Sequence, residues 1–80
     1  MKYVYLLESI SHPGQHYIGI TTYFRTRLKE HNAGRSSHTV RFRPWQTVVV
    51  IRFDDNREAN AFEKYLKSGS GHAFANRHFW

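Results

Sequence analysis

A helix-spaced pair of polar residues is the first feature with chemical potential. Arg27 and His31 are four residues apart, so in a helix they share one face. A guanidinium matches two phosphate oxygens, and an imidazole can move a proton near neutral pH. The pair therefore predicts a phosphate-binding group beside a proton-transfer group. The alternative is two solvated residues on a helix flank, and for His31 alone this alternative is favoured.

Two tyrosines form a second candidate pair. Tyr5 and Tyr17 lie in short segments rich in aromatic and branched residues, which predicts paired strands. On neighbouring strands their hydroxyls can face one surface. Tyrosines in strands are more often packing residues than catalysts. A phenol with a pKa of about 10 also needs a metal or a cationic neighbour to act as a base at neutral pH.

Glu63 is the third candidate. It follows Ala59 by four residues and precedes Leu66 by three, which places it on the shoulder of the buried stripe of a predicted helix. A carboxylate there is unfavourable unless a charged group meets it. A metal ion or an arginine would serve. The alternative is a structural ion pair with Arg27 or Lys67, which position alone slightly favours.

The elements that position these residues follow from turn and capping signals. We expect strands over residues 3–7 and 16–20, joined by a turn at His12-Pro13-Gly14 and paired antiparallel. A helix should then start at a Thr21 or Thr22 cap, run to about Asn32 and stop at Gly34. Residues 34–44 read as a basic loop with little that would bury.

The second half of the chain predicts one strand and two helices. The branched run in residues 45–53 fits a strand covered on both faces, or the central strand of a small sheet. Asp55 with Glu58 resembles a capping box for the next helix, which Lys67-Ser68-Gly69 ends. Ser70 can cap a short last helix. The expected fold is α+β: a three-stranded antiparallel sheet with helices packed on it, in the order β-β-α-β-α-α.

Composition predicts one domain over residues 1–80. Hydrophobic residues are 40% of the 80 residues and aromatic residues 16%, which is enough for a compact core. The absence of cysteine excludes disulfides and thiolate zinc sites. No apolar run is long enough to span a bilayer, and the N-terminal residues do not resemble a signal peptide. We therefore expect a cytoplasmic protein with no membrane partner.

The charge balance favours a polyanionic partner. Twelve Lys and Arg residues face six Asp and Glu residues, which gives a net charge of +6 and a pI near 10.1. Such a balance is typical of nucleic-acid-binding domains. A solvated basic face without a specific partner is the other interpretation. Apart from Arg27, the candidates for contacts with the nucleic-acid backbone are Arg25, Lys29, Arg35, Arg41 and Arg43.

The ordered set of motifs resembles the GIY-YIG nuclease family over almost the whole chain. Tyr17-Ile18-Gly19 is the second half of the naming motif, and Tyr3-Val4-Tyr5 keeps the closing tyrosine of the first half. Arg27 and His31 stand where the family's helix carries its arginine and its histidine or tyrosine. Phe62-Glu63-Lys64 matches the segment that bears the metal-ligand glutamate. Asn76 is similar to the asparagine that closes the domain.

The resemblance implies a metal-dependent endonuclease that hydrolyses phosphodiester bonds in DNA. The chain resembles the catalytic domain of structure-specific and repair nucleases, and residues 27–34 and Pro44-Trp45 are similar to the small bacterial and structure-specific branches of the family. One Mg²⁺ or Mn²⁺ would be held by Glu63, and Arg27 would hold the scissile phosphate. Tyr5 would orient or deprotonate the attacking water, and His31 would take the proton onward. Tyr17 and Asn76 would support the water or the phosphate and position the site.

The size of the chain limits how it selects a substrate. Eighty residues leave no room for a separate recognition domain, so we expect structure-dependent cleavage, or targeting by a partner protein, rather than sequence-specific cutting. RNA is not excluded as a substrate, and no oligomeric state is predicted. Two alternatives stay open: a non-catalytic nucleic-acid-binding module on the same scaffold, and an interaction domain whose basic face meets an acidic protein.

Overall fold

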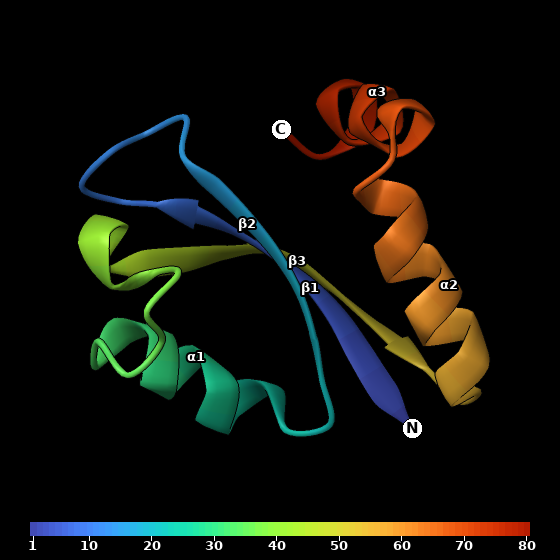
Figure 1. The fold of residues 1–80 in the computed structure, drawn as a ribbon, viewed down its shortest axis with the longest axis horizontal. Coiled ribbons are helices and arrows are strands. Elements are labelled where there is room, and N and C mark those ends of the chain that lie inside the picture. Colours follow the sequence, from blue (N-terminus) through green and yellow to red (C-terminus); the bar gives the residue numbers. More distant parts are fainter.

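A three-stranded antiparallel sheet separates one helix from two others in the computed structural model, which describes all residues from Met1 to Trp80 (Figure 1). The predicted order β-β-α-β-α-α is confirmed, with one short 3₁₀ turn, η1, added before the third strand. No helix combines the length and the apolar character needed to cross a membrane. The elements are β1 (Lys2–Ser9), β2 (His16–Thr21), α1 (Phe24–Asn32), η1 (Val40–Phe42), β3 (Trp45–Phe53), α2 (Asn56–Leu66) and α3 (Gly69–His78).

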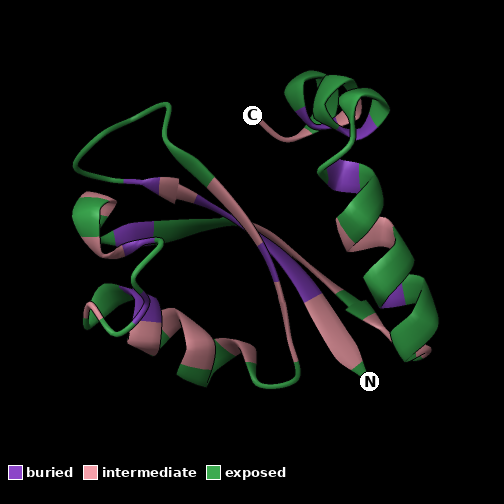
Figure 2. Cartoon of the chain, viewed as in Figure 1, coloured by how far each residue is buried: buried purple, intermediate pink, exposed green.

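The strand order is β2-β1-β3, so β1 is the central strand. The predicted pairing of β1 with β2 is confirmed, and Tyr5 lies opposite Gly19 in their register. The prediction that β3 could be central is wrong, because β1 carries the fully buried run of residues 4–7 and needs a partner on each side (Figure 2). At the edge, β3 tolerates an irregularity: Leu6 pairs with Val49 and Leu7 with Thr47, so Val48 is skipped.

The two faces of the sheet bury different layers. Successive side chains of a strand point to opposite faces. Val4 and Leu6 therefore pack under α2 and α3, while Tyr5 and Leu7 pack on the side of α1 (Figure 1). Both faces of β3 are covered as predicted, since Val49 joins the first layer and Val50 joins the second. The candidate residues Tyr5, Tyr17, Arg27 and His31 are thus brought to the α1 face.

The helix ends agree with prediction at two places. Gly34 stops the chain after α1 with a φ of 81°, which glycine adopts without strain. Asp55 caps α2, where its side chain accepts a hydrogen bond from the backbone N–H of Arg57 at 2.8 Å.

Two predicted caps are wrong. The residue before α1 is Tyr23, which makes no side-chain cap, and Thr21 only accepts a bond from the Tyr23 N–H at 3.2 Å. Ser68, not Ser70, caps α3 by accepting from the Gly71 N–H. Ser68 has the extended backbone that a cap residue requires, whereas Ser70 already lies within the first helical turn.

Candidate active site

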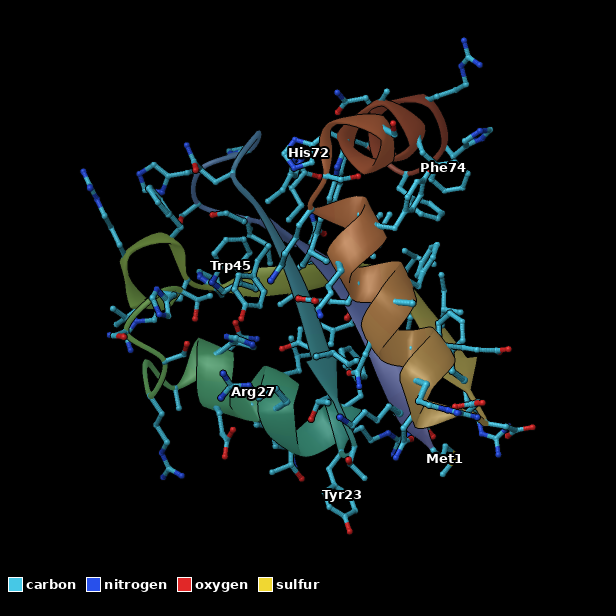
Figure 3. All side chains as sticks on the ribbon, turned by 45° about the vertical axis from the view of Figure 1, so that its right-hand side comes forward. Met1, Tyr23, Arg27, Trp45, His72 and Phe74 are labelled. Carbon is cyan, nitrogen blue, oxygen red and sulfur yellow. The ribbon has the colours of Figure 1, made fainter.

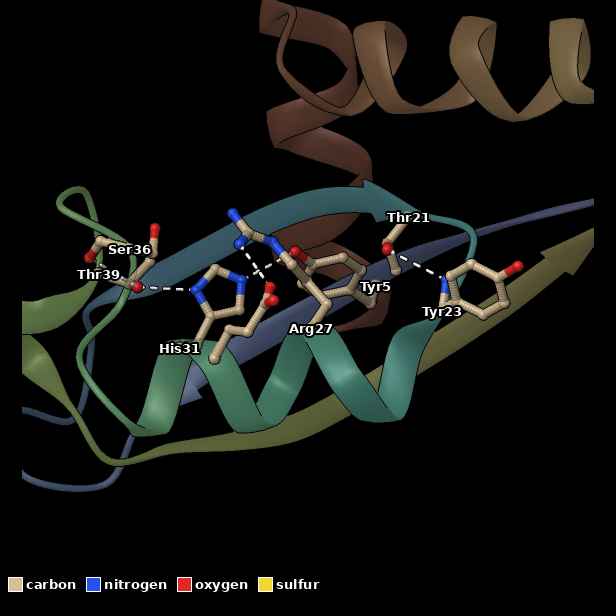
Figure 4. A network of polar contacts seen from close by, with 8 residues as sticks. Tyr5, Thr21, Tyr23, Arg27, His31, Ser36 and Thr39 are labelled. Atoms are coloured by element: carbon tan, nitrogen blue, oxygen red, sulfur yellow. Dashed lines mark hydrogen bonds and ion pairs between the residues drawn. The ribbon is translucent and has the colours of Figure 1, made fainter.

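Four of the candidate residues meet on the α1 face of the sheet. The Tyr5 hydroxyl oxygen lies 2.9 Å from Nε2 of His31, and this contact is buried (Figure 4). The Tyr17 ring lies 4.9 Å from the His31 ring, edge to face, and 6.1 Å from the Tyr5 ring. Arg27 projects from α1 one turn before His31, over the edge of the same cluster (Figure 4). Pairing of β1 with β2 and packing of α1 on them therefore assemble the cluster.

The Tyr5 phenol is held in its neutral form. Its side chain is almost completely buried. Burial is the main factor that raises the pKa of Tyr5 to about 12, and the nearby Tyr17 adds to the increase, while the Arg27 guanidinium opposes it. At neutral pH the hydroxyl therefore keeps its proton and can donate it in a hydrogen bond.

His31 is not the solvated flank residue that its position alone favours, because it is fully buried. The pKa of His31 is lowered to about 4, first by burial and second by the neighbouring Arg27, against a smaller opposing effect of Glu30. The expectation that this imidazole titrates near neutral pH needs correction for the same reason. The ring is neutral at pH 7, so one of its nitrogens is a hydrogen-bond acceptor.

Thr39 is the partner of His31 that sequence reasoning missed. Its hydroxyl oxygen lies 2.7 Å from Nδ1 of His31, and the hydroxyl reaches the carbonyl of Ser36 at 3.5 Å. A hydroxyl that donates to Ser36 accepts from Nδ1–H, which leaves Nε2 as the acceptor for the Tyr5 O–H. The structure thus favours one direction for the chain of hydrogen bonds that runs from Tyr5 through His31 to Thr39 and Ser36.

The segment that carries Thr39 is bound more firmly than predicted. Residues 34–44 were expected to bury little, yet Ser36 and Thr39 are both buried. The indole N–H of Trp45 donates to the Thr39 carbonyl at 2.9 Å, and the Asn32 side chain accepts from the backbone N–H of Trp45 at 2.6 Å. A serine and a threonine in a basic segment give no local signal of burial. Only the large apolar Trp45 beside the segment hints at such an anchor.

Arg27 is the half-buried cation of the site. Its Nη1 pairs with Oε1 of Glu30 at 3.0 Å, one helical turn away on α1. This bond to Glu30 is the main factor that raises the pKa of Arg27 above its usual value. The ion pair fixes part of the guanidinium, and the other N–H groups lie near Tyr5. The group can therefore meet an oxyanion there without losing its carboxylate partner.

Glu63 is on α2, which packs on the other face of the sheet, but its ion-pair partner Lys67 lines a cavity together with Tyr17 of this cluster. Its carboxylate forms an ion pair with the ammonium of Lys67, one of the two structural pairings considered from the sequence, and makes no ion pair with Arg27. The Glu63 side chain is only 15% exposed, whereas that of Lys67 is 53% exposed.

The donor set around Glu63 limits the kind of metal that it can bind. No group of three or more His, Asp or Glu side chains is arranged to hold a metal ion. A single carboxylate suits a hard cation such as Mg²⁺, which keeps most of its water and takes one or two carboxylates together with phosphate oxygens. The chemistry of Glu63 therefore fits Mg²⁺ or Mn²⁺ better than a fully protein-ligated site.

Asn76 is exposed on α3 and lines a cavity together with Tyr17 and Lys67. The cavity has a volume of about 310 Å³ and lies between β2 and the two C-terminal helices. Tyr17 also touches the buried cluster, so it connects the two sides of β2. Figure 3 shows Arg27 and His72 on the two sides of this strand.

The predicted nucleic-acid contacts are unpaired cations. None of Arg25, Lys29, Arg35, Arg41 and Arg43 makes an ion pair. Four of the six acidic residues, Glu30, Asp54, Asp55 and Glu63, are already paired with Lys or Arg within the chain, and Glu8 contacts His16. The excess positive charge therefore faces solvent, where it is available to phosphates.

Comparison with known proteins agrees with this arrangement. Residues 1–76 match the family described as the GIY-YIG catalytic domain. The chain is 35% identical over 82 aligned residues to structure-specific endonuclease subunit SLX1 of Debaryomyces hansenii, covering 94% of this chain and 22% of that protein. It is 38% identical over 66 residues to a UPF0213 protein of Streptococcus pneumoniae, covering 81% of this chain and 65% of that protein.

The match extends over the pieces that build the site. The chain spans about a fifth of the yeast relative and just under two thirds of the bacterial one. The matched residues 1–76 include both tyrosine-bearing strands, the helix with Arg27 and His31, and the helix with Glu63. On these grounds the chain belongs to the GIY-YIG family of nuclease domains.

Proposed function

We propose that the chain is a metal-dependent DNA endonuclease, with residues 1–80 as its catalytic domain. The observation that carries the proposal is the buried hydrogen bond of 2.9 Å between Tyr5 and His31, with Arg27 at its edge. A polar pair of this kind is unfavourable in a core unless its groups are satisfied, and it adds little that an apolar pair would not. Its presence in a strongly basic chain favours a role in phosphate chemistry.

Arg27 would bind the scissile phosphate. Guanidinium N–H groups match phosphate oxygens, and they stabilise negative charge that grows on them during hydrolysis. The pair with Glu30 leaves the guanidinium held from one side. The Arg27 side chain therefore needs little further ordering when the substrate binds, and this lowers the entropic cost of reaching the transition state.

Tyr5 would orient the attacking water rather than take its proton. The pKa of Tyr5 is raised to about 12 and that of His31 is lowered to about 4, so the free protein disfavours transfer of the phenol proton to the imidazole. A neutral Tyr5 that donates to His31 keeps its oxygen as an acceptor for an incoming water, whose other proton would pass to a phosphate oxygen of the substrate. His31 and Thr39 would then hold the phenol in place.

Glu63 would hold one Mg²⁺ or Mn²⁺. Bound there, the cation would stabilise the charge on the phosphate and on the departing 3′ oxygen. Its binding requires Glu63 to leave Lys67. Tyr17 and Asn76, which line the neighbouring cavity, would position the DNA strand across β2, between the cation on Glu63 and the guanidinium of Arg27.

Cleavage would depend on DNA structure more than on sequence. The unpaired cations of α1 and of residues 34–44 suit contacts with the phosphate backbone, which position a substrate without reading its bases. The name of the yeast relative, a structure-specific endonuclease subunit, supports both this preference and a partner protein that directs the domain.

A cleavage assay tests the proposal. End-labelled single-stranded, duplex, nicked and branched DNA would be incubated with the wild type, Glu63→Ala and Arg27→Ala, with Mg²⁺, with Mn²⁺ and with chelator. Glu58→Ala is the matched control, since Glu58 lies on the same helix and makes no ion pair. We expect metal-dependent cutting by the wild type and the control, and a loss of at least about 100-fold in the two site variants.

The non-catalytic alternative predicts a different pattern. A binding module would retard all four DNA forms in a gel shift, cut none of them with either metal, and respond to Glu63→Ala no more than to Glu58→Ala. That pattern would refute the endonuclease proposal.

A further inference from the structure

The cavity beside the catalytic cluster is large enough for a small ligand. Its volume of about 310 Å³ lies at the lower end of ligand pockets, which run from roughly 300 to 1,000 Å³. It opens between the edge strand β2, the end of α2, and α3. Its lining consists of His16, Tyr17, Ile18, Lys67, His72, Ala75, Asn76 and Trp80.

One wall of the cavity is a flat aromatic pair. The rings of His16 and Trp80 are stacked with their centroids 3.7 Å apart and their planes within 5° of parallel. Nε2 of His16 lies 3.5 Å from the carboxylate of Glu8, and Trp80 packs against the main core, so both rings are held in place. Trp80 lies beyond residues 1–76, which the family match covers.

The polar lining of the cavity suits a phosphate. Lys67, His72 and Asn76 contribute an ammonium, an imidazole and an amide; the ammonium is paired with the carboxylate of Glu63, which is not among the lining residues. A positively charged groove with an aromatic platform is the arrangement by which proteins hold single-stranded nucleic acid, since every base has a face that stacks. The base of an intact duplex cannot reach such a platform without leaving its partner.

We propose that this cavity binds one unpaired nucleotide of the DNA strand, with its base against the His16–Trp80 wall and its phosphate toward Lys67 and His72. The inference rests on the proposed endonuclease function and names its substrate class. Tyr17 lines the cavity and also lies edge to face with His31, so the bound nucleotide is next to the catalytic cluster. The preferred substrate then carries unpaired nucleotides beside the cut.

Equilibrium binding in chelator tests the proposal without any cleavage. Fluorescence anisotropy would measure the affinity of the full chain for a labelled single strand, a blunt duplex and a duplex with a single-stranded flap. The variants are Trp80→Leu, which removes the stacking ring but keeps an apolar side chain, and His72→Ala. The controls are Tyr65→Leu on α2 and His38→Ala, both outside the cavity.

We expect the wild type to bind the single strand and the flap at least about tenfold more tightly than the blunt duplex, since stacking of one base accounts for such a factor. Trp80→Leu should remove most of this preference, His72→Ala should weaken binding of the unpaired forms, and both controls should match the wild type. Equal affinity for all three DNA forms, or a uniform loss across them in Trp80→Leu, would overturn the proposal.

Intrinsic fluorescence gives a second readout that separates stacking from misfolding. Trp45 is 4% exposed, so quenching on addition of an unlabelled single strand reports Trp80. Quenching should occur in the wild type and in Tyr65→Leu and be absent in Trp80→Leu, while circular dichroism shows that all three are folded. If the wild type bound the single strand without any quenching of its fluorescence, no nucleotide would be stacked on Trp80.

The two proposals fail in different ways. A preference for unpaired DNA in chelator, followed by no cutting with Mg²⁺ or Mn²⁺, would leave the nucleotide cavity standing and remove the endonuclease. Metal-dependent cutting of a blunt duplex at the rate of a flap, with no effect of Trp80→Leu, would keep the endonuclease and remove the cavity assignment.

Discussion

The ring of Tyr5 lies directly over Gly19, its partner across the β1–β2 pair. A Cβ atom built on Gly19 would clash with the ring carbon and the hydroxyl oxygen of Tyr5, and it would also come within 2.9 Å of the Tyr17 ring. The absence of a side chain at position 19 is thus what lets the phenol lie flat across β2 and reach His31. The glycine in Tyr17-Ile18-Gly19 serves the site through packing, not through backbone flexibility.

Replacing Gly19 tests this relationship. In Gly19→Ala the Tyr5 ring must move, because its β2 partner now occupies the same space. We expect a loss of stability of about 1–3 kcal/mol from overpacking, and a fall in cleavage rate of at least about 100-fold, since a shift of about 1 Å in a catalytic group has that effect. Urea unfolding and single-turnover cleavage would measure the two.

Gly69→Ala is the matched control for this substitution. Nothing lies within 4 Å of a Cβ atom at Gly69, in the first turn of α3. The change should leave cleavage unaltered and raise stability by up to about 1 kcal/mol, because alanine favours the helix. A Gly19→Ala protein that cleaves like Gly69→Ala would show that the position of the Tyr5 ring does not matter to the site.

The fold was predictable from local patterns, because apolar runs and turn residues each pointed to one element. The order of strands and helices, the Gly34 stop and the Asp55 cap all follow from such signals. The errors arose where tertiary packing decides. Central or edge position in the sheet depends on which strand finds two partners, and both Ser68 and Ser70 are acceptable caps until the backbone selects one.

The site was only partly predictable for a similar reason. The residue types and spacing of Arg27 and His31 placed them on one helix face, but nothing in their neighbourhood showed that His31 would be fully buried. Burial reverses the expected chemistry of the imidazole, because desolvation keeps it neutral. Thr39 was missed since its contact with His31 depends on how residues 34–44 fold back over α1.

Thr39 should act as a positioning residue for His31. In Thr39→Val the isosteric side chain cannot hydrogen-bond, so Nδ1 of His31 is left buried without a partner, which costs about 1–3 kcal/mol. We expect the cleavage rate to fall at least about tenfold. The nitrogen chemical shifts of His31 should show a mixture of tautomers where the wild type shows Nδ1–H.

Two further substitutions are the controls for Thr39→Val. Thr39→Ser keeps the hydroxyl and should retain the Nδ1–H tautomer and most of the activity. Thr47→Val removes a hydroxyl from an exposed position on β3 and should change neither. If Thr39→Val kept the wild-type tautomer and rate while Thr39→Ser lost them, side-chain shape rather than hydrogen bonding would explain the role of Thr39.

The burial of His31 should make stability fall in weak acid. The pKa of His31 is lowered to about 4 in the folded chain, from 6.5 in the unfolded chain, so between these values the unfolded chain binds a proton that the folded chain does not. The free energy of unfolding therefore carries no penalty from His31 above pH 6.5, and it decreases as the pH falls toward 4. The expected loss is about 3 kcal/mol at pH 4 relative to pH 7.

Comparison of variants isolates this contribution from the titration of carboxylates. Urea unfolding at pH 7 and pH 4 would be measured for the wild type, His31→Gln and His38→Gln. His31→Gln should lose less stability between the two pH values than the wild type, whereas His38→Gln, which changes an exposed histidine, should lose as much. Parallel losses in all three proteins would argue against a lowered pKa at His31.

The unpaired cations should contribute to DNA affinity without distinguishing its forms. Arg41→Ala and Lys29→Ala should each weaken binding of single-stranded and duplex DNA alike, and each should reduce the slope of log affinity against log salt by about 0.7–0.9. Arg57→Ala is the control, because Arg57 is also exposed but lies on α2 and is paired with Asp55. If the slope of log affinity against log salt were the same in Arg57→Ala and Arg41→Ala, the DNA would have to bind to a surface that does not include Arg41.

The ion pair between Glu63 and Lys67 should compete with cation binding. Lys67 occupies the carboxylate that the proposed Mg²⁺ or Mn²⁺ requires, and the Lys67 side chain is 53% exposed, so the pair is worth at most about 1 kcal/mol. Lys67→Gln should therefore bind Mn²⁺ up to about fivefold more tightly than the wild type. The measurement is Mn²⁺ titration followed by electron paramagnetic resonance, without DNA, so that no contact of Lys67 with a nucleotide enters.

The neighbouring lysine and the carboxylate itself complete that comparison. Lys64 lies on the same helix and makes no ion pair, so Lys64→Gln should bind Mn²⁺ like the wild type. Glu63→Gln should abolish binding, because the amide offers no negative charge to the cation. If Lys67→Gln and Lys64→Gln bound Mn²⁺ equally and Glu63→Gln bound it as well, the cation would have to be held by groups other than Glu63, and the ion pair would be a purely structural contact on α2.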